Sequence, residues 1–387
     1  MPTPEPIKST RTPEVILADL VAFPGLPGQP NGPIAGWIAD TLQAAGLTVH
    51  RVPMPDGDRL NLLASIGPAD QPGGMILSGH MDVVPVEGQA WTTDPFRLTN
   101  VDGRLQARGA TDMKGFLACM IAAVPMFQAA GLKRPVHLAF SCDEEIGCRG
   151  APYLIAQLPR LCAPAAGCIV GEPSGLQPVL SHKGKVAYEV AFEGRSAHSS
   201  EPARGVNALY AAASLARAVE EQAGAIVTGG RRDPRFSPDY STLVAGVLRA
   251  GSAVNIIPDR ATLAFELRTI PGDDADAMLA PLLACAAAEV EAGRAVSWHA
   301  TEIARYPALP PDAQALADKL SSWTGQTPRQ SVSYGTEAGL FHAAGIPSIV
   351  CGPGDIARAH RPDEYITADE LAGCMSLFAK LARELSQ

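Results

Sequence analysis

The sequence has no excess of positive charge and no long apolar run. Its 387 residues carry 31 Lys and Arg against 40 Asp and Glu, a formal net charge of -9. It therefore lacks the basic field that binding to nucleic acid or to an anionic membrane requires. The polar, proline-rich start of the chain lacks the apolar segment of a signal peptide, and no apolar stretch reaches the length that spans a bilayer. We therefore expect a cytoplasmic protein without nucleic-acid or membrane partners.

Paired-cysteine motifs are also missing. The eight cysteines are scattered without a C-x-x-C pair, which argues against a zinc ribbon or a redox motif. Disulfide frameworks belong to small secreted domains, so buried free thiols are expected. As a nucleophile Cys142 would need a nearby histidine, but its neighbours are carboxylates, which raise a thiol pKa. No glycine-rich turn joins a strand to a helix at a suitable place, so a nucleotide-binding α/β protein is disfavoured.

Apolar strands and helices alternate in the first half of the chain and again near its end. Hydrophobic residues make up 47% of the sequence, enough for a sizeable core. The pattern predicts an α/β fold, with a mixed, largely parallel sheet between helices. Strands are predicted at 47–52, 60–66, 75–80, 136–141, 167–171 and 348–351, and helices at 13–21, 34–45, 113–130, 151–157, 312–324 and 368–385.

The pattern changes near Lys183, where longer alternating strands and two long helices begin. Their order is β-α-β-β-α-β, which suits a small α+β domain. The predicted elements are 186–192, 206–221, 242–248, 261–268, 274–291 and 296–301. We therefore predict one domain formed by residues 1–183 and 305–387, with residues 184–304 inserted as a second, smaller domain.

Four groups of carboxylate and imidazole side chains follow predicted strands. Ligands of open α/β sheets gather at the carboxyl ends of strands, so these side chains are expected to lie close together. The groups are Gly79-His80-Met81-Asp82, Asp112, Asp143-Glu144-Glu145 and Gly171-Glu172-Pro173-Ser174.

The residue types in these groups suit a metal centre. In an extended segment His80 and Asp82 face the same way, so the Asp82 carboxylate is expected to accept from a ring nitrogen of His80 instead of binding metal. The adjacent Glu144 and Glu145 would repel each other without a cation. One of them can bind metal while the other accepts a proton from water. Zinc suits nitrogen and carboxylate ligands, and a pair of zinc ions would need a bridge, for which Asp112 is the candidate.

Each element alone has an ordinary explanation. A lone His-x-Asp is usually a surface or turn feature, and paired glutamates are common on solvated faces. Glu172 could be a turn residue before a proline, and His360, between two arginines, could be a surface histidine. What favours a metal site is the ordered set, in which four members each follow an apolar strand.

These motifs resemble the M20 family of metallopeptidases and amidohydrolases, and within it the acetylornithine deacetylase branch. The resemblance runs from about residue 12 to the C-terminus. It rests on Gly79-His80-Met81-Asp82-Val83-Val84-Pro85, Trp91, Asp94-Pro95-Phe96, Asp102-Gly103, Arg108-Gly109, Asp112-Met113-Lys114-Gly115, Asp143-Glu144-Glu145 and Gly171-Glu172-Pro173. It implies a zinc-peptidase-like catalytic domain with two Zn²⁺ ions per subunit, for which Co²⁺ can substitute.

The resemblance also implies a role for each site residue. One metal would be held by His80, Asp112 and Glu172, and the other by Asp112, Glu145 and His360. Glu144 would be the catalytic base, and Asp82 would orient the ring of His80 without binding metal itself.

The smaller domain matches the family's lid and dimerisation domain. The resemblance implies that His198, in Gly194-Arg195-Ser196-Ala197-His198, reaches the active site of a second subunit and stabilises the oxyanion. Asn255 and Arg268 match positions that meet the substrate carboxylate, a task for which the planar fork of arginine is suited. Arg268 could equally be a surface arginine in an ion pair. Gly335 and Thr336 match the substrate-contacting loop, although a Gly-Thr turn before a helix is also common.

The branch implies removal of the acetyl group from N2-acetyl-L-ornithine, a step of arginine biosynthesis, by a cytoplasmic homodimer. Strings such as Ser181-His182-Lys183-Gly184 and Ala359-His360-Arg361-Pro362-Asp363-Glu364-Tyr365 favour this branch over the succinyl-diaminopimelate desuccinylases. The alternatives are hydrolysis of another N-acyl amino acid or of a dipeptide. A non-catalytic metal-binding protein on the same scaffold is an alternative of another class. It would be expected to lack Glu144 or part of the metal cage, the name used here for the five ligands His80, Asp112, Glu145, Glu172 and His360.

Overall fold

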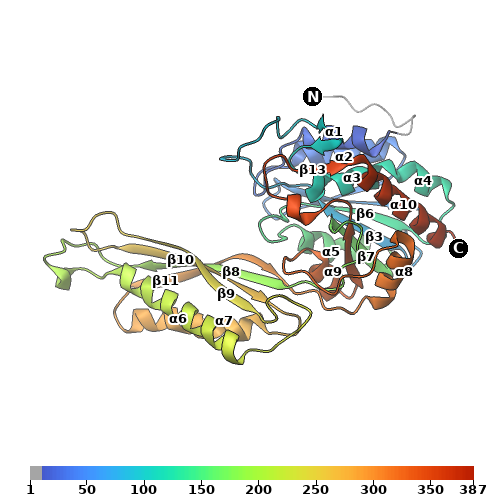
Figure 1. The fold of residues 1–387 in the computed structure, drawn as a ribbon. Coiled ribbons are helices and arrows are strands. Elements are labelled where there is room, and N and C mark those ends of the chain that lie inside the picture. The colour runs from blue at the N-terminus through green and yellow to red at the C-terminus, as the bar shows by residue number, and fades with distance from the viewer. Residues whose placement is uncertain (1–10) are drawn as a thin grey trace. The chain divides into compact units, whose positions relative to one another are not determined.

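The structure is a computed structural model that describes residues 11–387. The expectation that the chain lacks a signal peptide rests partly on residues 1–10, which lie outside the described residues. The chain forms two compact units (Figure 1). The larger unit consists of the chain up to Ser181, Leu309–Ser331 and Thr336–Gln387, and the smaller unit consists of His182–Ala308 and Val332–Gly335.

The segment Val332–Gly335 departs from the predicted division, which placed it in the larger domain. Val332 forms a β-bridge with His182. A Cβ on Gly335 would lie 2.1 Å from the ring of Tyr306 and 2.8 Å from the carbonyl oxygen of Lys183. These contacts join the segment to the smaller unit, and those with His182 and Lys183 arise between residues about 150 positions apart, which sequence periodicity does not report.

The larger unit is built on a six-stranded sheet in the order β1-β2-β6-β3-β7-β12. Strands β6, β3, β7 and β12 are parallel neighbours. Strand β2 pairs antiparallel with β6, and β1 pairs antiparallel with β2. Strands β3, β6 and β7 are buried along their whole length, which explains their near-continuous apolar sequences. The bounds are β1 (Val49–Pro53), β2 (Leu60–Ile66), β3 (Met75–His80), β6 (Val136–Ser141), β7 (Gly167–Pro173) and β12 (Ser348–Gly352).

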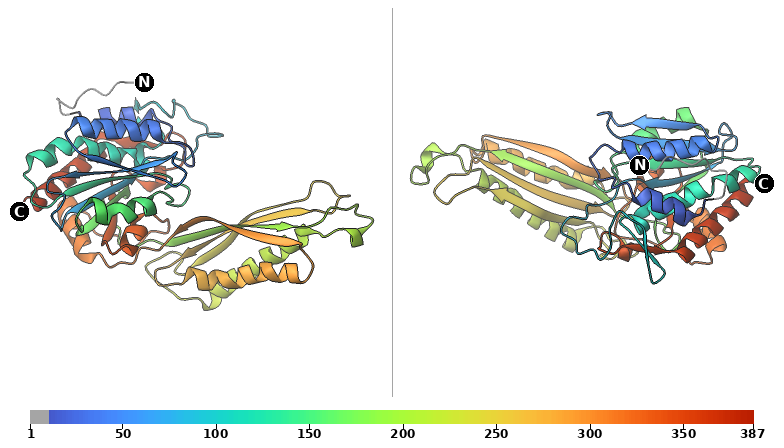
Figure 2. Two further views of the ribbon diagram at one scale, coloured as in Figure 1. Left: turned by 180° about the vertical axis from the view of Figure 1, so that it is seen from behind. Right: turned by 90° about the horizontal axis from the view of Figure 1, so that it is seen from above.

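Helices cover both faces of this sheet (Figures 1 and 2), which confirms the predicted α/β class. The core joins strand and helix side chains, and its aromatic contacts include Phe116 against Phe378 at 5.5 Å between ring centroids. The helices are α1 (Pro13–Val21), α2 (Gly32–Ala44), α3 (Gly115–Ala122), α4 (Val124–Ala129), α5 (Ala151–Leu161), α8 (Gln314–Thr324), α9 (Ala338–Ala343) and α10 (Ala368–Leu385).

The single helix predicted at 113–130 is in fact broken. A π-type turn, Ala110–Lys114, precedes α3, and α4 begins a new helix that carries Pro125 in its first turn. Proline has no N–H to donate and its ring clashes with the carbonyl four residues earlier, which explains the break before α4.

The region Ala110–Ala129 also corrects the expectation that no stretch reaches membrane-spanning length. By length and composition it is long and apolar enough to cross a membrane, but 83% of its apolar window is buried inside the structure. It is the central helical segment of the larger unit, where α3 contacts α1 and α10.

A three-stranded sheet was missed by the sequence analysis because its strands are too short to show periodicity. It consists of β13 (Tyr365–Thr367), β5 (Arg104–Gln106) and β4 (Thr99–Val101), in that order. Tyr365 pairs with Gln106 and Thr367 with Arg104. The sheet therefore joins the chain near Arg108 to the chain near His360.

The smaller unit is an antiparallel sheet in the order β11-β8-β10-β9, with two helices packed on it (Figure 2). Its core includes Val190, Phe192 and Leu263 from the strands and Leu215 from a helix. The elements follow the expected β-α-β-β-α-β order. They are β8 (Gly184–Glu193), α6 (Ala208–Gly229), β9 (Thr242–Ala250), β10 (Arg260–Thr269), α7 (Ala275–Glu291) and β11 (Ser297–Tyr306).

Candidate metal centre

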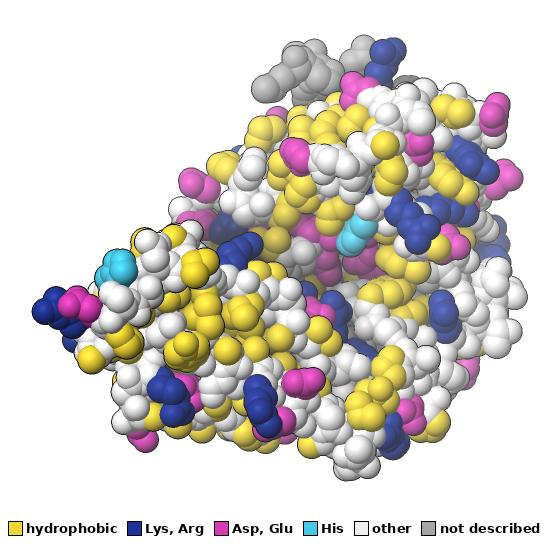
Figure 3. Space-filling view, turned by 60° about the vertical axis from the view of Figure 1, so that its left-hand side comes forward, with side chains coloured by type: hydrophobic (Ala, Val, Ile, Leu, Met, Phe, Trp, Pro, Cys, Tyr) yellow, Lys and Arg dark blue, Asp and Glu magenta, His cyan; other side chains and the backbone are white. Residues whose placement is uncertain are grey.

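Five side chains that could hold metal come together at one edge of the larger unit's sheet. His80 ends β3 and Glu172 lies near the end of β7, the parallel neighbour of β3. Glu145 follows β6 on the other side of β3, while Asp112 lies in the turn before α3 and His360 follows the short helical turn Ile356–Arg358. Carboxyl ends of parallel strands meet at one edge, which brings His80, Glu145 and Glu172 together. Asp112 was expected to follow a strand directly, but a turn after β5 places it at this edge, and another turn places His360 there. Figure 3 shows acidic side chains gathered on this unit.

The five residues form two groups that share Asp112. His80 Nε2 lies 3.1 Å from Asp112 Oδ1 and 3.7 Å from Glu172 Oε1. His360 Nε2 lies 3.2 Å from Asp112 Oδ2 and 3.2 Å from Glu145 Oε2. In each group the ligand atoms lie within 4.8 Å of one another. One oxygen of Asp112 thus faces each group, which is the arrangement of a bridging carboxylate.

The donor set fits a pair of divalent cations. Each group offers one imidazole nitrogen and carboxylate oxygens, the ligands that zinc prefers. Glu145 Oε1 is buried and has no hydrogen-bond partner among the described residues, although buried polar atoms are nearly always satisfied. A cation at the second group would satisfy this atom.

Burial perturbs the pKa values of the carboxylates in the metal-free protein. Burial raises the pKa of Glu144 to about 8, although the nearby His80 opposes the shift. Burial likewise raises the pKa of Asp82 to about 6 and that of Glu172 well above its ordinary value. Burial would also raise the pKa of Asp112, but hydrogen bonds from His360 and His80 hold it below its ordinary value. Positive charge is therefore favoured beside Asp112.

The histidines supply that charge in the absence of metal. Hydrogen bonds to Asp112 and Glu145 raise the pKa of His360 to about 10. Burial would lower the pKa of His80, but the hydrogen bond to Asp112 and the surrounding carboxylates raise it well above its ordinary value. Histidine must be neutral to bind metal, so metal binding here is coupled to proton release.

Asp82 contacts His80 in a different way from the one predicted. The ring Nδ1 of His80 lies 2.8 Å from the main-chain oxygen of Asp82 and 3.9 Å from its carboxylate. The carboxylate instead accepts from the main-chain N–H of Glu144, at 3.2 Å, and of Glu145, at 3.1 Å. Strand β3 ends at His80, so the alternation assumed for the pair does not continue to Asp82. Asp82 therefore fixes both the ring of His80 and the loop of the two glutamates.

Glu144 has one contact that the sequence analysis did not foresee. The Cys148 Sγ donates to Glu144 Oε1 at 3.2 Å, and Cys148 is buried. All eight cysteines are free thiols. Burial and the neighbouring Asp143 raise the pKa of Cys142, so this thiol is held in its unreactive form, as expected.

His198 lies on an exposed segment at the tip of the smaller unit. The main-chain N–H of Ser200 donates to His198 Nδ1 at 3.2 Å, and the Ser200 hydroxyl lies 2.7 Å from the same nitrogen. Because Nδ1 accepts, the neutral ring carries its proton on Nε2, where it can be donated to another group. The Ser199 N–H donates to the Asn255 carbonyl at 3.0 Å, so His198 and Asn255 share one tip.

Arg268 lies far from that tip. It is in the second-last position of β10, and its Nε and Nη1 donate to Glu266 at 3.0 Å and to the Tyr306 hydroxyl at 3.2 Å. Asn255 lies before the start of β10 at Arg260, eight strand residues from Arg268, which corresponds to roughly 27 Å. One chain therefore does not bring Asn255 and Arg268 to the same carboxylate.

The predicted substrate loop is divided between the two units. Gly335 has no room for a side chain, since its Cβ position is occupied by Tyr306. Thr336 is fully buried, and its hydroxyl accepts from the N–H of Ala338 at 3.0 Å, at the start of α9. The Thr336 side chain is therefore already engaged in a hydrogen bond within the chain, and a ligand in this loop would contact main-chain atoms.

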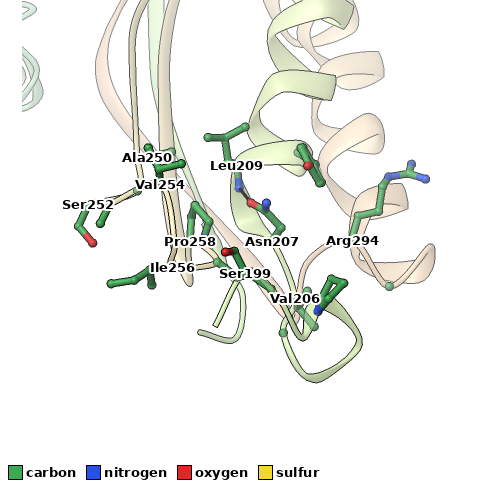
Figure 4. Close-up of a pocket in the computed structure, with 17 residues that line it drawn as sticks. Ser199, Val206, Asn207, Leu209, Ala250, Ser252, Val254, Ile256, Pro258 and Arg294 are labelled. Carbon is green, nitrogen blue, oxygen red and sulfur yellow. Dashed lines mark hydrogen bonds between the residues drawn. The ribbon is translucent and has the colours of Figure 1, made fainter. Parts of the chain in front are cut away.

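The smaller unit also has a cavity of about 820 Å³ beside the His198 segment (Figure 4). Its lining combines Ser199 and Asn207 with the apolar Val254 and Ile256, both of which are exposed. Hydrophobic side chains are visible on the surface of this unit in Figure 3. The cavity contains no residue of the metal cage.

Residues 76–384 match the sequence pattern of peptidase family M20/M25/M40. An acetylornithine deacetylase of Myxococcus xanthus is 34% identical over 372 residues, which cover 94% of this chain and 95% of the relative. An acetylornithine deacetylase of Edwardsiella ictaluri (strain 93-146) is 32% identical over 366 residues, covering 92% and 90% of the two chains.

Solved structures show the same fold. An M20 family metallo-carboxypeptidase from Sulfolobus solfataricus superimposes with a TM-score of 0.75 at 19% identity, covering 96% of this chain and 98% of the other. A tripeptidase from Staphylococcus aureus gives a TM-score of 0.72 at 18% identity, with coverage of 98% and 99%. A dinuclear metal-binding peptidase of the M20 family from Bacillus subtilis gives a TM-score of 0.62 at 18% identity, with coverage of 95% of this chain and 96% of the other.

Proposed function

Because this chain belongs to peptidase family M20/M25/M40 and is a metal-dependent hydrolase, we propose that it removes the acetyl group from N2-acetyl-L-ornithine. The observation that carries the chemistry is the division of the two Asp112 oxygens between two ligand groups, and the buried Glu144 interacts electrostatically with His80 and Asp112. The substrate is supported by acetylornithine deacetylases that match about nine-tenths of the chain. The products would be L-ornithine and acetate, as a step of arginine biosynthesis in the cytoplasm.

Each residue of the cage has a separate task in this proposal. Two Zn²⁺ ions, or Co²⁺ in their place, would polarise the amide carbonyl and lower the pKa of a water molecule. His80, Asp112 and Glu172 would hold one ion, and Asp112, Glu145 and His360 the other.

Glu144 transfers the proton. It takes a proton from the attacking water as the oxygen bonds to the carbonyl carbon, and it passes that proton to the nitrogen of ornithine as the C–N bond breaks. Asp82 and Cys148 hold Glu144 in place, the first through the main chain and the second through the carboxylate. The Nε2–H of His198 donates to the oxygen that becomes negatively charged during attack.

We further propose that the working site needs a second copy of the chain, joined through the smaller unit. Strand β9 is an edge strand of the described sheet, and it exposes Val244, Val247 and Leu248. An edge strand with apolar side chains is a template for pairing with another chain. The lining of the cavity at the tip includes Ala250, the last residue of β9 (Figure 4).

The separation of Asn255 and Arg268 supports the same arrangement. If both residues contact one substrate carboxylate, Arg268 comes from one subunit and Asn255, together with His198, comes from the other. The active site would then combine the metal cage of one copy with the tip of its partner.

The substrate proposal is tested with a panel of compounds on protein reconstituted with Zn²⁺. We expect kcat/KM to be highest for N2-acetyl-L-ornithine among acetyl amino acids, succinyl-diaminopimelate and dipeptides. A higher kcat/KM for any other member would replace acetylornithine with that substrate and leave the reaction class intact.

The role of Glu144 is tested separately with Glu144→Gln. The amide keeps the size of the side chain but cannot take a proton, so kcat should fall by roughly 10²–10⁴-fold while two metal ions remain bound. Unchanged turnover in a fully metal-loaded sample would show that another group is the base.

A further inference from the structure

A buried ion pair lies directly behind the metal cage. Arg108 and Glu364 are each 1% exposed, and Arg108 Nη1 lies 2.6 Å from Glu364 Oε2. Arg108 follows β5, and Glu364 immediately precedes β13. Strands β5 and β13 already pair through their main chains, so this ion pair is not needed to join them. Desolvation makes a buried ion pair costly, which points to a role beyond stability.

The second oxygen of Glu364 binds the main chain at the bridging ligand. Glu364 Oε1 accepts from the N–H of Thr111 at 2.9 Å and from the N–H of Asp112 at 3.0 Å. Hydrogen bonds from main-chain N–H groups to an ionised carboxylate are stronger than neutral ones. Glu364 therefore fixes the turn from which Asp112 projects.

Arg108 and Gln89 reach the other loop of the cage. Arg108 Nη1 also donates to the carbonyl of Arg361 at 3.3 Å, and its Nη2 donates to Gln89 Oε1. The amide of Gln89 in turn donates to the carbonyl of His360 at 3.1 Å. One connected set of side chains thus contacts the main chain of both Asp112 and His360.

Trp91 keeps this set in position. The guanidinium of Arg108 stacks on its ring, 5.1 Å from the centroid, and the indole N–H donates to Gln89 Oε1 at 3.1 Å. A guanidinium offers five donors in a fixed plane, which lets Arg108 bind Glu364, Gln89 and a carbonyl while stacked. A lysine at this position would keep the charge but lose that geometry.

His360 requires support of this kind. The three ligands of the first group are buried, whereas 54% of the His360 side chain is exposed. Its φ of +62° lies in the left-handed region, which is unfavourable for a residue other than glycine and persists only where the surroundings impose it. Burial does not fix His360, so contacts to its main chain must do so.

We propose that Arg108, Glu364 and Gln89, here called the clamp, are positioning residues that hold Asp112 and His360 at the separation required by the second metal. This inference rests on the metal centre of the proposed function. None of the three clamp residues belongs to either group of metal ligands. The clamp acts mainly on the occupancy of the group formed by Asp112, Glu145 and His360. The other group shares Asp112 but also contains His80 and Glu172, which are held by strands β3 and β7 and not by the loops that the clamp contacts.

The test is a titration of metal-free protein with Zn²⁺ against a competing chelator, repeated with Co²⁺ and followed by its absorption spectrum. The variants are Arg108→Lys, Glu364→Gln and Gln89→Met. Arg358→Lys is the matched control, because Arg358 pairs with Glu370 at 2.9 Å only two residues from His360, yet Glu370 lies in α10 outside the cage.

In the wild type we expect two ions to bind. In the clamp variants the first step should keep its affinity and the second should weaken at least tenfold, while the control keeps both steps. The lost activity of the clamp variants should return as the Zn²⁺ concentration is raised. Gln89 is only partly buried, so Gln89→Met provides a folded variant if the substitutions of the buried pair do not fold.

An unchanged second step in Gln89→Met and in the folded pair variants would overturn the inference. Equal weakening of both steps would also overturn it, because that result indicates general damage to the fold. A wild-type protein that binds fewer than two ions would instead refute the proposed two-metal centre.

Discussion

Removal of metal should make the stability of the larger unit fall as the pH rises. In the metal-free protein burial raises the pKa of Glu144 from 4.5 to about 8. Between these values the folded state retains a proton that the unfolded chain has lost. Folding then becomes less favourable with each increment of pH, because the carboxylate must be ionised in a buried, acidic site.

His360 acts in the same direction over a higher range. Its hydrogen bonds to Asp112 and Glu145 raise its pKa from 6.5 to about 10. The stability contributed by the protonated ring is fully present below pH 6.5 and is lost as the pH rises towards 10. Asp112 does not offset this loss, since its lowered pKa changes stability only in acid.

The size of the stability change with pH follows from the difference in bound protons between the folded and unfolded states. One proton of difference corresponds to about 1.4 kcal/mol per pH unit. Glu144 contributes most of one proton between pH 6 and 8, and the exposure of His360 screens much of its share. Burial lowers the pKa of Lys114 to about 7, which acts in the opposite direction above pH 7, but it does so in the metal-free and the zinc-loaded protein alike. Relative to the zinc-loaded protein we therefore expect a loss of about 1 kcal/mol per pH unit, or about 2 kcal/mol between pH 6 and 8. Bound metal requires deprotonated ligands, so the zinc-loaded protein should show no such loss.

The assay is denaturant unfolding at pH 6, 7 and 8, with chelator-treated and zinc-loaded samples compared. Three of the four tryptophans, Trp37, Trp91 and Trp323, belong to the larger unit, so fluorescence reports mainly on it. Glu144→Gln should flatten the slope of the metal-free protein, and Asp70→Asn, on an exposed turn, should leave it unchanged. A metal-free stability that stays constant or rises from pH 6 to 8 relative to that of the zinc-loaded protein would refute the reasoning.

Three further predictions concern the residues around the cage and the tip. Asp82→Ala should weaken metal binding roughly 10–100-fold, measured by competition with a chelator, because His80 and the loop of the two glutamates lose their support; unchanged affinity would contradict this. His198→Asn should lower kcat roughly 10²–10³-fold with little change in KM or metal content, and normal kcat would exclude the oxyanion role. Leu248→Glu should sediment as a monomer that binds two ions but has a low kcat. The control Thr228→Glu, on an exposed part of α6, should stay dimeric. A dimeric Leu248→Glu would exclude the β9 edge as the interface.

The order of strands and helices could be predicted because long elements carry a clear hydrophobic period. His80 and Glu172 were placed near each other by a general property of parallel sheets, namely that strand ends meet at one edge. His360 could not be placed in this way. It follows no strand, and its position depends on a left-handed main chain and on contacts to Gln89 about 270 residues earlier.

Other features escaped prediction for related physical reasons. The partner of His80 is the main-chain carbonyl of Asp82, and no sequence pattern distinguishes a carbonyl from the carboxylate of the same residue. The contact between Cys148 and Glu144 depends on a turn in which Cys148 has a φ of +56°. Arg108 and Glu364 lay within the motifs of the resemblance, and two opposite charges beside predicted ligands were the signal that could have identified the clamp.

The smaller unit is inserted between the ligands of the cage, which has a consequence for synthesis of the protein. His80, Asp112, Glu145 and Glu172 are all translated before the insertion begins, whereas His360 is translated only after roughly 180 further residues. At 5–20 residues per second this interval lasts roughly 10–35 s. The first ligand group can therefore be complete on a nascent chain while the second is not, so a second ion could be bound only after His360 has been translated.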